Sequence, residues 1–102
     1  MYTTVVMNAK GGVGKTTIAT NIAGYFAVNG VPTAIMDYDP QGSSLHWIEQ
    51  RAADAPPIHG ADAGSRGGRG LHSLARHIPH ETEQLIVDAP AGPSPLLMKE
   101  LL

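Results

Sequence analysis

The chain has 102 residues, of which 42% are hydrophobic and 16% charged, and these proportions are ordinary for one small globular domain. The net charge of -2 argues against attraction of the whole domain to DNA or to an anionic membrane, but it allows a local basic patch. The absence of cysteine excludes a disulfide framework, a thiolate zinc site and a cysteine-held iron–sulfur cluster, and it fits a reducing cytosol. We expect neither a signal peptide nor a membrane helix, because the first residues are polar and no apolar run approaches the ~18 residues of a membrane span.

The first part of the chain predicts a strand, a helix and a second strand. Residues 3–7, TTVVM, are a run without alternating polar side chains, which indicates a strand buried on both faces. Residues 15–29 show helical spacing, and Asn29-Gly30 provides a stop signal. The side chains expected on the buried face of this helix are Ile18, Ile22, Tyr25 and Phe26. Residues 33–36 then predict the second strand.

The rest of the chain continues the alternation of helices and strands. Ser43-Ser44 is expected to cap a short helix that runs to about residue 51. Residues 53–70 are rich in Pro, Gly and Ala and predict an irregular surface loop. A helix over residues 71–78, a third strand over residues 84–87 and a helix from residue 94 follow. Strands that alternate with helices predict an α/β fold with a parallel sheet.

The strongest functional signal is the glycine-rich segment AKGGVGKTT, residues 9–17, between the first strand and the first helix. Glycines let backbone N–H groups approach an anion closely, and a helix start adds unpaired N–H groups and the positive end of its dipole. Lys15 supplies a charge for the β- and γ-phosphates, and the Thr16 hydroxyl suits Mg²⁺. The alternative is a glycine-rich turn with two surface lysines. The residues expected to bind nucleotide are Lys10, Gly11, Gly12, Val13, Gly14, Lys15, Thr16 and Thr17.

Aspartates follow two of the expected strands. Asp37 and Asp39 come after the second strand, in DYDPQG, and Asp88 ends the third strand. Ligand groups in open parallel sheets gather at the carboxyl ends of the strands, where carboxylates suit metal-bound water and an attacking water. The alternative for the first pair is an Asx-type turn that ends in proline, and an apolar strand that ends in Asp is common by itself.

Together these motifs resemble the ParA/MinD family of deviant Walker A, SIMIBI-class P-loop ATPases. Lys10 before the double glycine, with Ala9 where the usual pattern has Gly, is similar to the family's deviant Walker A box. DYDPQ is similar to its Walker A′ motif, and the strand that ends at Asp88 to its Walker B strand. The resemblance covers residues 3–95 and implies a three-layer P-loop NTPase fold of which only the N-terminal part is present. Residues 1–102 would then be the N-terminal portion of a single ParA-like ATPase domain whose C-terminal portion is absent.

The resemblance also implies roles for particular residues. Lys10 would reach the nucleotide of a partner subunit across a dimer interface, so that it serves catalysis together with Lys15. Asp39 would orient or activate the attacking water. The residues implied at Mg²⁺ are Thr16, Asp37 and Asp88.

The family resemblance implies an ATP-dependent cycle. ATP and Mg²⁺ bind, a homodimer forms, the dimer binds DNA non-specifically, and a ParB-like or other small DNA-binding activator stimulates hydrolysis. Such a protein is a cytoplasmic, nucleoid-associated switch for plasmid or chromosome partition or for the positioning of another cargo. The alternatives are a MinD-like division-site protein, a metallocluster-assembly ATPase, which the lack of cysteine disfavours, and a non-catalytic nucleotide-binding fragment.

A parallel sheet of three strands leaves unpaired backbone groups along at least one edge. Full-length members of the family continue well past residue 102, and their later strands would cover such an edge. We therefore expect the 102-residue chain by itself to be marginally stable or to self-associate.

Overall fold

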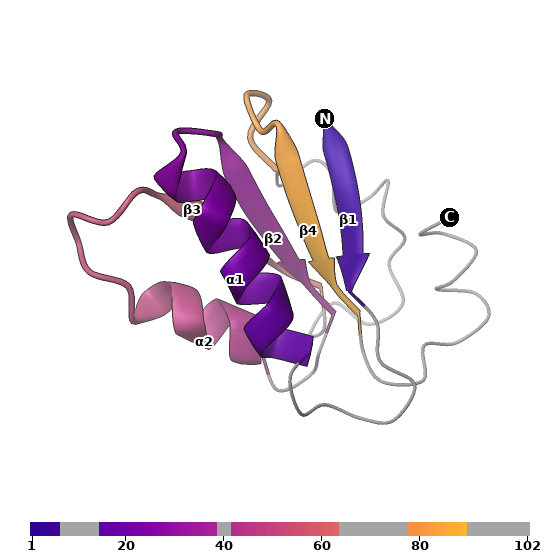
Figure 1. Cartoon of the computed structure of the whole chain (residues 1–102). Coiled ribbons are helices and arrows are strands. Elements are labelled where there is room, and N and C mark those ends of the chain that lie inside the picture. The colour runs from indigo at the N-terminus through magenta and orange to yellow at the C-terminus, as the bar shows by residue number, and fades with distance from the viewer. Residues whose placement is uncertain (7–14, 39–41, 64–77, 90–102) are drawn as a thin grey trace.

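A computed structural model describes residues 1–6, 15–38, 42–63 and 78–89 (Figure 1). Within these ranges the strands form one sheet in the order β1-β4-β2-β3, and every neighbouring pair is parallel. The elements in chain order are β1 (Tyr2–Val6), α1 (Lys15–Val28), β2 (Thr33–Asp37), α2 (Ser43–Glu49), β3 (Ile58–Asp62) and β4 (Gln84–Asp88). The predicted α/β fold with a parallel sheet is therefore confirmed.

Strand β4 lies between β1 and β2, although it is the last of the described strands along the chain (Figure 1). Asp88 at its carboxyl end is in register with Val6 of β1 on one side and with Asp37 of β2 on the other. In β4, Leu85, Ile86 and Val87 are at most 1% exposed, and every residue of β2 is buried. The two apolar strands are thus the interior of the sheet, as their lack of polar alternation requires.

Strand β1 differs from its prediction. Its first residues are exposed, Tyr2 to 75%, and Val6 is the one residue of the strand that is buried. The expectation of a strand buried on both faces is wrong for residues 3–6, because β1 comes at the end of the order of the described strands, with β4 as its neighbour on one side. An apolar run does not reveal whether a strand will be central or at an edge.

Helix α1 buries small side chains rather than the large ones that its spacing suggested. The residues of α1 packed against the sheet are Ala19, Ala23 and Ala27. Ile22 and Phe26 flank this alanine face and are partly buried, as expected. Ile18 and Tyr25 are 54% and 65% exposed, so their predicted burial is wrong. Alanine at every fourth residue lets the helix axis lie close to the strands. This close approach leaves no room between helix and sheet for the larger side chains of Ile18 and Tyr25.

The predicted stop of α1 is confirmed in detail. Gly30 has φ 77°, and its N–H donates to the carbonyl of Ala27 at 3.0 Å. The N–H of Val31 donates to the carbonyl of Phe26, also at 3.0 Å. These two bonds are those of a Schellman motif, in which a left-handed glycine satisfies the last carbonyls of a helix.

Strand β3 lies inside residues 53–70, which were expected to be irregular. Ile58–Asp62 pairs in parallel with β2, so the prediction of a structureless loop and of a three-stranded sheet is wrong. His59, Gly60 and Asp62 have low strand propensity, and the strand has no regular alternation of burial. The open edge of β2 supplies the hydrogen-bond partners, and burial of Ile58 and Ala61 adds apolar contacts.

Two helices cover one face of the sheet, as Figure 1 shows for α1 and α2. We call this the helix-side face. Its buried cluster consists of Val6, Ala19, Ala23, Ala27, Ile35, Ile58 and Ile86, with Ile22, Phe26, Trp47 and Ile48 packed against it. The buried cluster of the opposite face consists of Ala34, Met36, Tyr38, Ala61, Ala63, Leu85 and Val87, with Val5 and Ile78 packed against it.

The remaining predicted helices fall largely outside the described ranges. Residues 71–77 and the helix expected from residue 94 are among those not described, and Ile78 is a bend. In the described part of the chain, no helix combines the length and the apolar character needed to cross a membrane.

Gly60 provides a test of the packing between α2 and β3. A Cβ at Gly60 would lie 2.8 Å from Leu45 Cδ2 and 3.1 Å from Ile48 Cδ1, so both side chains of α2 would have to move. We expect Gly60→Ala to lower the free energy of unfolding by about 1–3 kcal/mol, as overpacking does. Urea unfolding followed by circular dichroism measures this change.

The control for Gly60→Ala is Gly24→Ala on α1. Its Cβ would meet Trp47 Cη2 at 3.9 Å, an ordinary contact, and helix interiors favour Ala over Gly. We expect this substitution to raise the free energy of unfolding by about 0.5–1 kcal/mol. Equal effects of the two substitutions would contradict the close packing of α2 on β3.

Candidate functional site

Two aspartates lie side by side at the carboxyl edge of the sheet. Asp37 ends β2 and Asp88 ends β4, and the two are partners in the register of these strands. Both are 0% exposed. The structure therefore brings together two of the residues that the sequence singled out, although they lie far apart along the chain.

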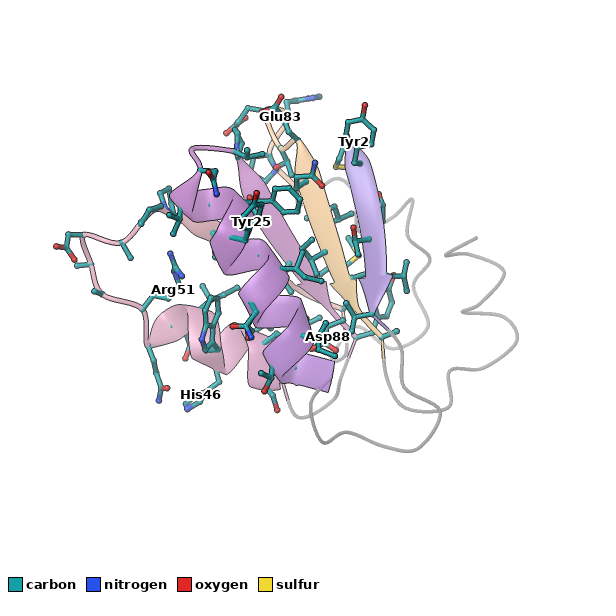
Figure 2. The ribbon with its side chains drawn as sticks, viewed as in Figure 1. Tyr2, Tyr25, His46, Arg51, Glu83 and Asp88 are labelled. Carbon is teal, nitrogen blue, oxygen red and sulfur yellow. The ribbon has the colours of Figure 1, made fainter. Side chains whose placement is uncertain are left out.

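Both carboxylates belong to the helix-side face. Side chains two residues apart in a strand point to the same face of the sheet. Ile35 and Ile86, each two residues before one of the aspartates, belong to the cluster beneath α1 and α2. In Figure 2 Asp88 lies at the same end of the sheet as the first turn of α1, and α1 contacts β4. The carboxylates thus face the helices at the end where α1 begins.

Asp37 accepts hydrogen bonds from the start of α2. Its Oδ2 receives the N–H of Ser44 at 3.1 Å and the N–H of Leu45 at 3.3 Å. The residue at the N-cap of α2 is Gly42, with φ 64°, and it supplies no side-chain cap. The expectation that Ser43-Ser44 caps the helix is wrong, because a carboxylate from the neighbouring strand takes the role of the cap.

Ser44 instead directs its hydroxyl to the other aspartate. Its Oγ–H donates to Asp88 Oδ2, and the side chain of Ser44 is 0% exposed. The sequence pattern predicts a helix cap at this serine and does not indicate a site residue. The available signal was a small polar residue in the first turn of a helix that begins just after an acidic strand end.

The two aspartates offer carboxylate oxygen atoms as possible metal ligands at this edge of the sheet. Buried carboxylates need hydrogen bonds or a cation to offset their lost hydration, and two of them side by side add mutual repulsion. Mg²⁺ takes oxygen ligands and is usually held by one or two carboxylates together with phosphates. Within the described ranges, no group of three or more His, Cys, Asp or Glu residues could hold a metal. The donor set at this edge therefore fits Mg²⁺ that is shared with a phosphate ligand.

The other predicted site residues are partly described. Lys15 is the first residue of α1, Thr16 follows in the same turn and is half-buried, and Thr17 is exposed. The residues that lie outside the described ranges are Lys10, Gly11, Gly12, Val13, Gly14 and Asp39.

Removal of the Asp37 carboxylate tests its role at α2. Asp37→Ala leaves the N–H groups of Ser44 and Leu45 without this acceptor, so we expect the free energy of unfolding to fall by about 1–3 kcal/mol. The exposed Asp54 is the matched control, and Asp54→Ala should change stability by less than about 0.5 kcal/mol. Thermal melting of both variants decides the point, and equal melting temperatures would exclude a capping role for Asp37.

The chain is similar in sequence to known nucleotide-binding proteins. The profile of the CobQ/CobB/MinD/ParA nucleotide binding domain family matches residues 4–92. The chain is 43% identical over 54 residues to maintenance of carboxysome distribution protein A of Halothiobacillus neapolitanus, covering 53% of this chain and 24% of that protein. It is 54% identical over 41 residues to the chromosome-partitioning ATPase Soj of Treponema pallidum, covering 40% of this chain and 16% of that protein.

A third relative is protein IncC of Escherichia coli, 40% identical over 52 residues, which are 51% of this chain and 14% of that protein. The matched part of the chain thus spans at most about a quarter of the length of these relatives. The family profile nevertheless extends over most of the chain, from β1 past β4. The chain belongs to the CobQ/CobB/MinD/ParA family of nucleotide-binding domains.

Proposed function

We propose that residues 1–102 are the N-terminal portion of a single ParA-like ATPase domain, and that the complete protein is an ATP-binding and ATP-hydrolysing dimerisation switch. The observation that supports this function best is the pair of buried aspartates, Asp37 and Asp88, at the sheet edge where α1 begins. A carboxylate pair beside a helix that starts with Lys-Thr suits a Mg²⁺–nucleotide complex.

Each part of the proposed site has a distinct task. The residues from Lys10 to Thr17 bind the phosphates, with the charge of Lys15 directed to the β- and γ-phosphates. Thr16, Asp37 and Asp88 would hold Mg²⁺, and the bound ion would neutralise charge on the phosphates. Since Mg²⁺ sheds its waters reluctantly, Asp37 would act from the second coordination shell of the ion and Asp88 would contact it through water.

Asp39 orients the water that attacks the γ-phosphate in line. The N–H of Tyr38 donates to the backbone carbonyl of Asp88 at 2.9 Å, so the chain just before Asp39 is held at the end of β4. This contact supports the assignment of Asp39, the next residue along the chain, as the group that acts on a water near the phosphates. Catalysis in such a site comes from positioning and from stabilisation of charge rather than from covalent chemistry.

The proposed biological role is plasmid or chromosome partition in the cytoplasm, at the nucleoid. The similarity to the chromosome-partitioning ATPase Soj supports this role. We propose an ATP-dependent homodimer in which Lys10 reaches the partner subunit's nucleotide, non-specific DNA binding by that dimer, and hydrolysis stimulated by a ParB-like or other small DNA-binding activator. The positioning of another cargo is a second candidate, favoured by the 43% identity to a carboxysome distribution protein.

Lys15→Ala tests the phosphate site. Loss of a charge-assisted hydrogen bond of about 1.5–3 kcal/mol should weaken ATP binding roughly 10- to 150-fold. Fluorescence titration with an ATP analogue measures the affinity. Arg51→Ala is a control that removes the same charge elsewhere, because Arg51 lies over Trp47 and donates to the carbonyl of Pro56. Unchanged affinity in Lys15→Ala would refute the assignment of the phosphate loop.

Lys10→Ala tests the dimer switch in the complete protein. We expect ATP still to bind, because Lys15 remains, while ATP-dependent dimerisation and ATP hydrolysis fail. Light scattering with and without ATP, together with phosphate release, measures the two effects. A normal ATP-dependent dimer in this variant would remove the proposed role of Lys10.

A further inference from the structure

One buried residue donates hydrogen bonds to both aspartates of the candidate site. The Ser44 N–H donates to Asp37 Oδ2 at 3.1 Å, and its Oγ–H donates to Asp88 Oδ2. Its side chain is 0% exposed, as are both aspartates. The first turn of α2 thus joins the two carboxylates through a single residue.

The hydroxyl of Ser44 is not needed to start the helix. The position belongs to the first turn of α2, where the N–H of Ser44 is already bonded to Asp37. Alanine has the higher helix propensity, and a buried hydroxyl has a cost unless it is hydrogen-bonded. Among the described residues, the partner of this hydroxyl oxygen is Asp88, so a serine at this position is explained by the aspartate rather than by the helix.

Ser44 and Tyr38 both bond to Asp88, and they lie on either side of the connection between β2 and α2. Tyr38, directly after β2, donates its N–H to the backbone carbonyl of Asp88 at 2.9 Å. Ser44, in the first turn of α2, donates to the carboxylate of the same residue. Asp88 therefore holds the chain on both sides of residues 39–41, once through its backbone and once through its side chain.

We propose that Ser44 is a positioning residue that fixes the carboxylate of Asp88 for Mg²⁺ and connects that carboxylate to helix α2. The proposal rests on the proposed function, because it assigns Asp88 to a Mg²⁺–nucleotide site. Hydrogen bonds to a metal-binding carboxylate fix its orientation, and their loss weakens metal affinity. Ser44 acts through Asp88 and Asp37 and has no role of its own in the chemistry.

The test compares Ser44→Ala with Ser43→Ala in the full chain, since Ser43 is the exposed neighbour on the same helix. A fluorescent ATP analogue is titrated with Mg²⁺ and, separately, in EDTA, and thermal melting reports folding. In Ser44→Ala we expect the Mg²⁺ concentration at half-maximal effect to rise about 10- to 100-fold. The affinity of Ser44→Ala for the ATP analogue in EDTA should stay within about twofold of that of the parent protein. Ser43→Ala should match the parent protein in both measurements.

A merely structural role for Ser44 would give a different result. It would lower the melting temperature and weaken nucleotide binding equally with and without Mg²⁺, and this outcome overturns the proposal. An unchanged or lower Mg²⁺ midpoint overturns it as well. Ser44→Cys keeps the size of the side chain with a weaker donor, so its midpoint should lie between those of the parent and Ser44→Ala, and it replaces Ser44→Ala if that variant does not fold.

A double variant that combines Ser44→Ala with Asp88→Asn tests whether Ser44 acts through Asp88. If Ser44 acts through Asp88, the two substitutions together should shift the Mg²⁺ midpoint by less than the product of their separate shifts. Independent, multiplicative shifts would overturn the proposal. Failure of the unsubstituted complete protein to bind the ATP analogue with Mg²⁺ rejects the proposed function and this inference together. Normal Mg²⁺-dependent binding that Ser44→Ala leaves intact rejects the role of Ser44 alone.

Discussion

The burial of two carboxylates on adjacent strands is the constraint on which the rest of this structure depends. Asp37 and Asp88 are partners in the register of β2 and β4, and neither is exposed. Two like charges without water are unfavourable unless donors or a cation surround them. The backbone N–H groups at the start of α2 and the hydroxyl of Ser44 supply these donors, and so the position of α2 follows from the pair.

The same constraint extends outward through the fold. Helix α2 has no side-chain cap of its own and relies on Asp37, and its Leu45 and Ile48 pack closely over Gly60 of β3. Strand β3 in turn has little intrinsic tendency to be a strand and forms against β2. Direct contacts therefore connect the outer part of the sheet, α2 and the candidate site, and we expect a change at the carboxylates to change stability as well.

This coupling suits a protein of the CobQ/CobB/MinD/ParA family. A ligand that binds at the two aspartates would interact with the same carboxylates that hold the start of α2. Its binding would therefore act on α2 directly, without an intervening structural element. The outer surface of α1 exposes Ile18, Tyr25 and Val28, while its alanine face lies on the sheet. The function we propose assigns the phosphates to the start of α1 and the metal to the neighbouring strand ends.

Local sequence patterns were sufficient to predict several elements of this fold and two residues of the candidate site. Helix α1 and its stop at Gly30, the central strands β2 and β4 and the aspartates at their ends all follow from residues close together along the chain. The position of β1 at an edge, the burial of alanines instead of Ile18 and Tyr25, and strand β3 were decided by tertiary structure. These features depend on which strands become neighbours, and that choice is made by contacts between distant residues. The bonds of Ser44 to both aspartates exist for the same reason, since the order β1-β4-β2-β3 brings Asp88 next to Asp37 beneath the first turn of α2.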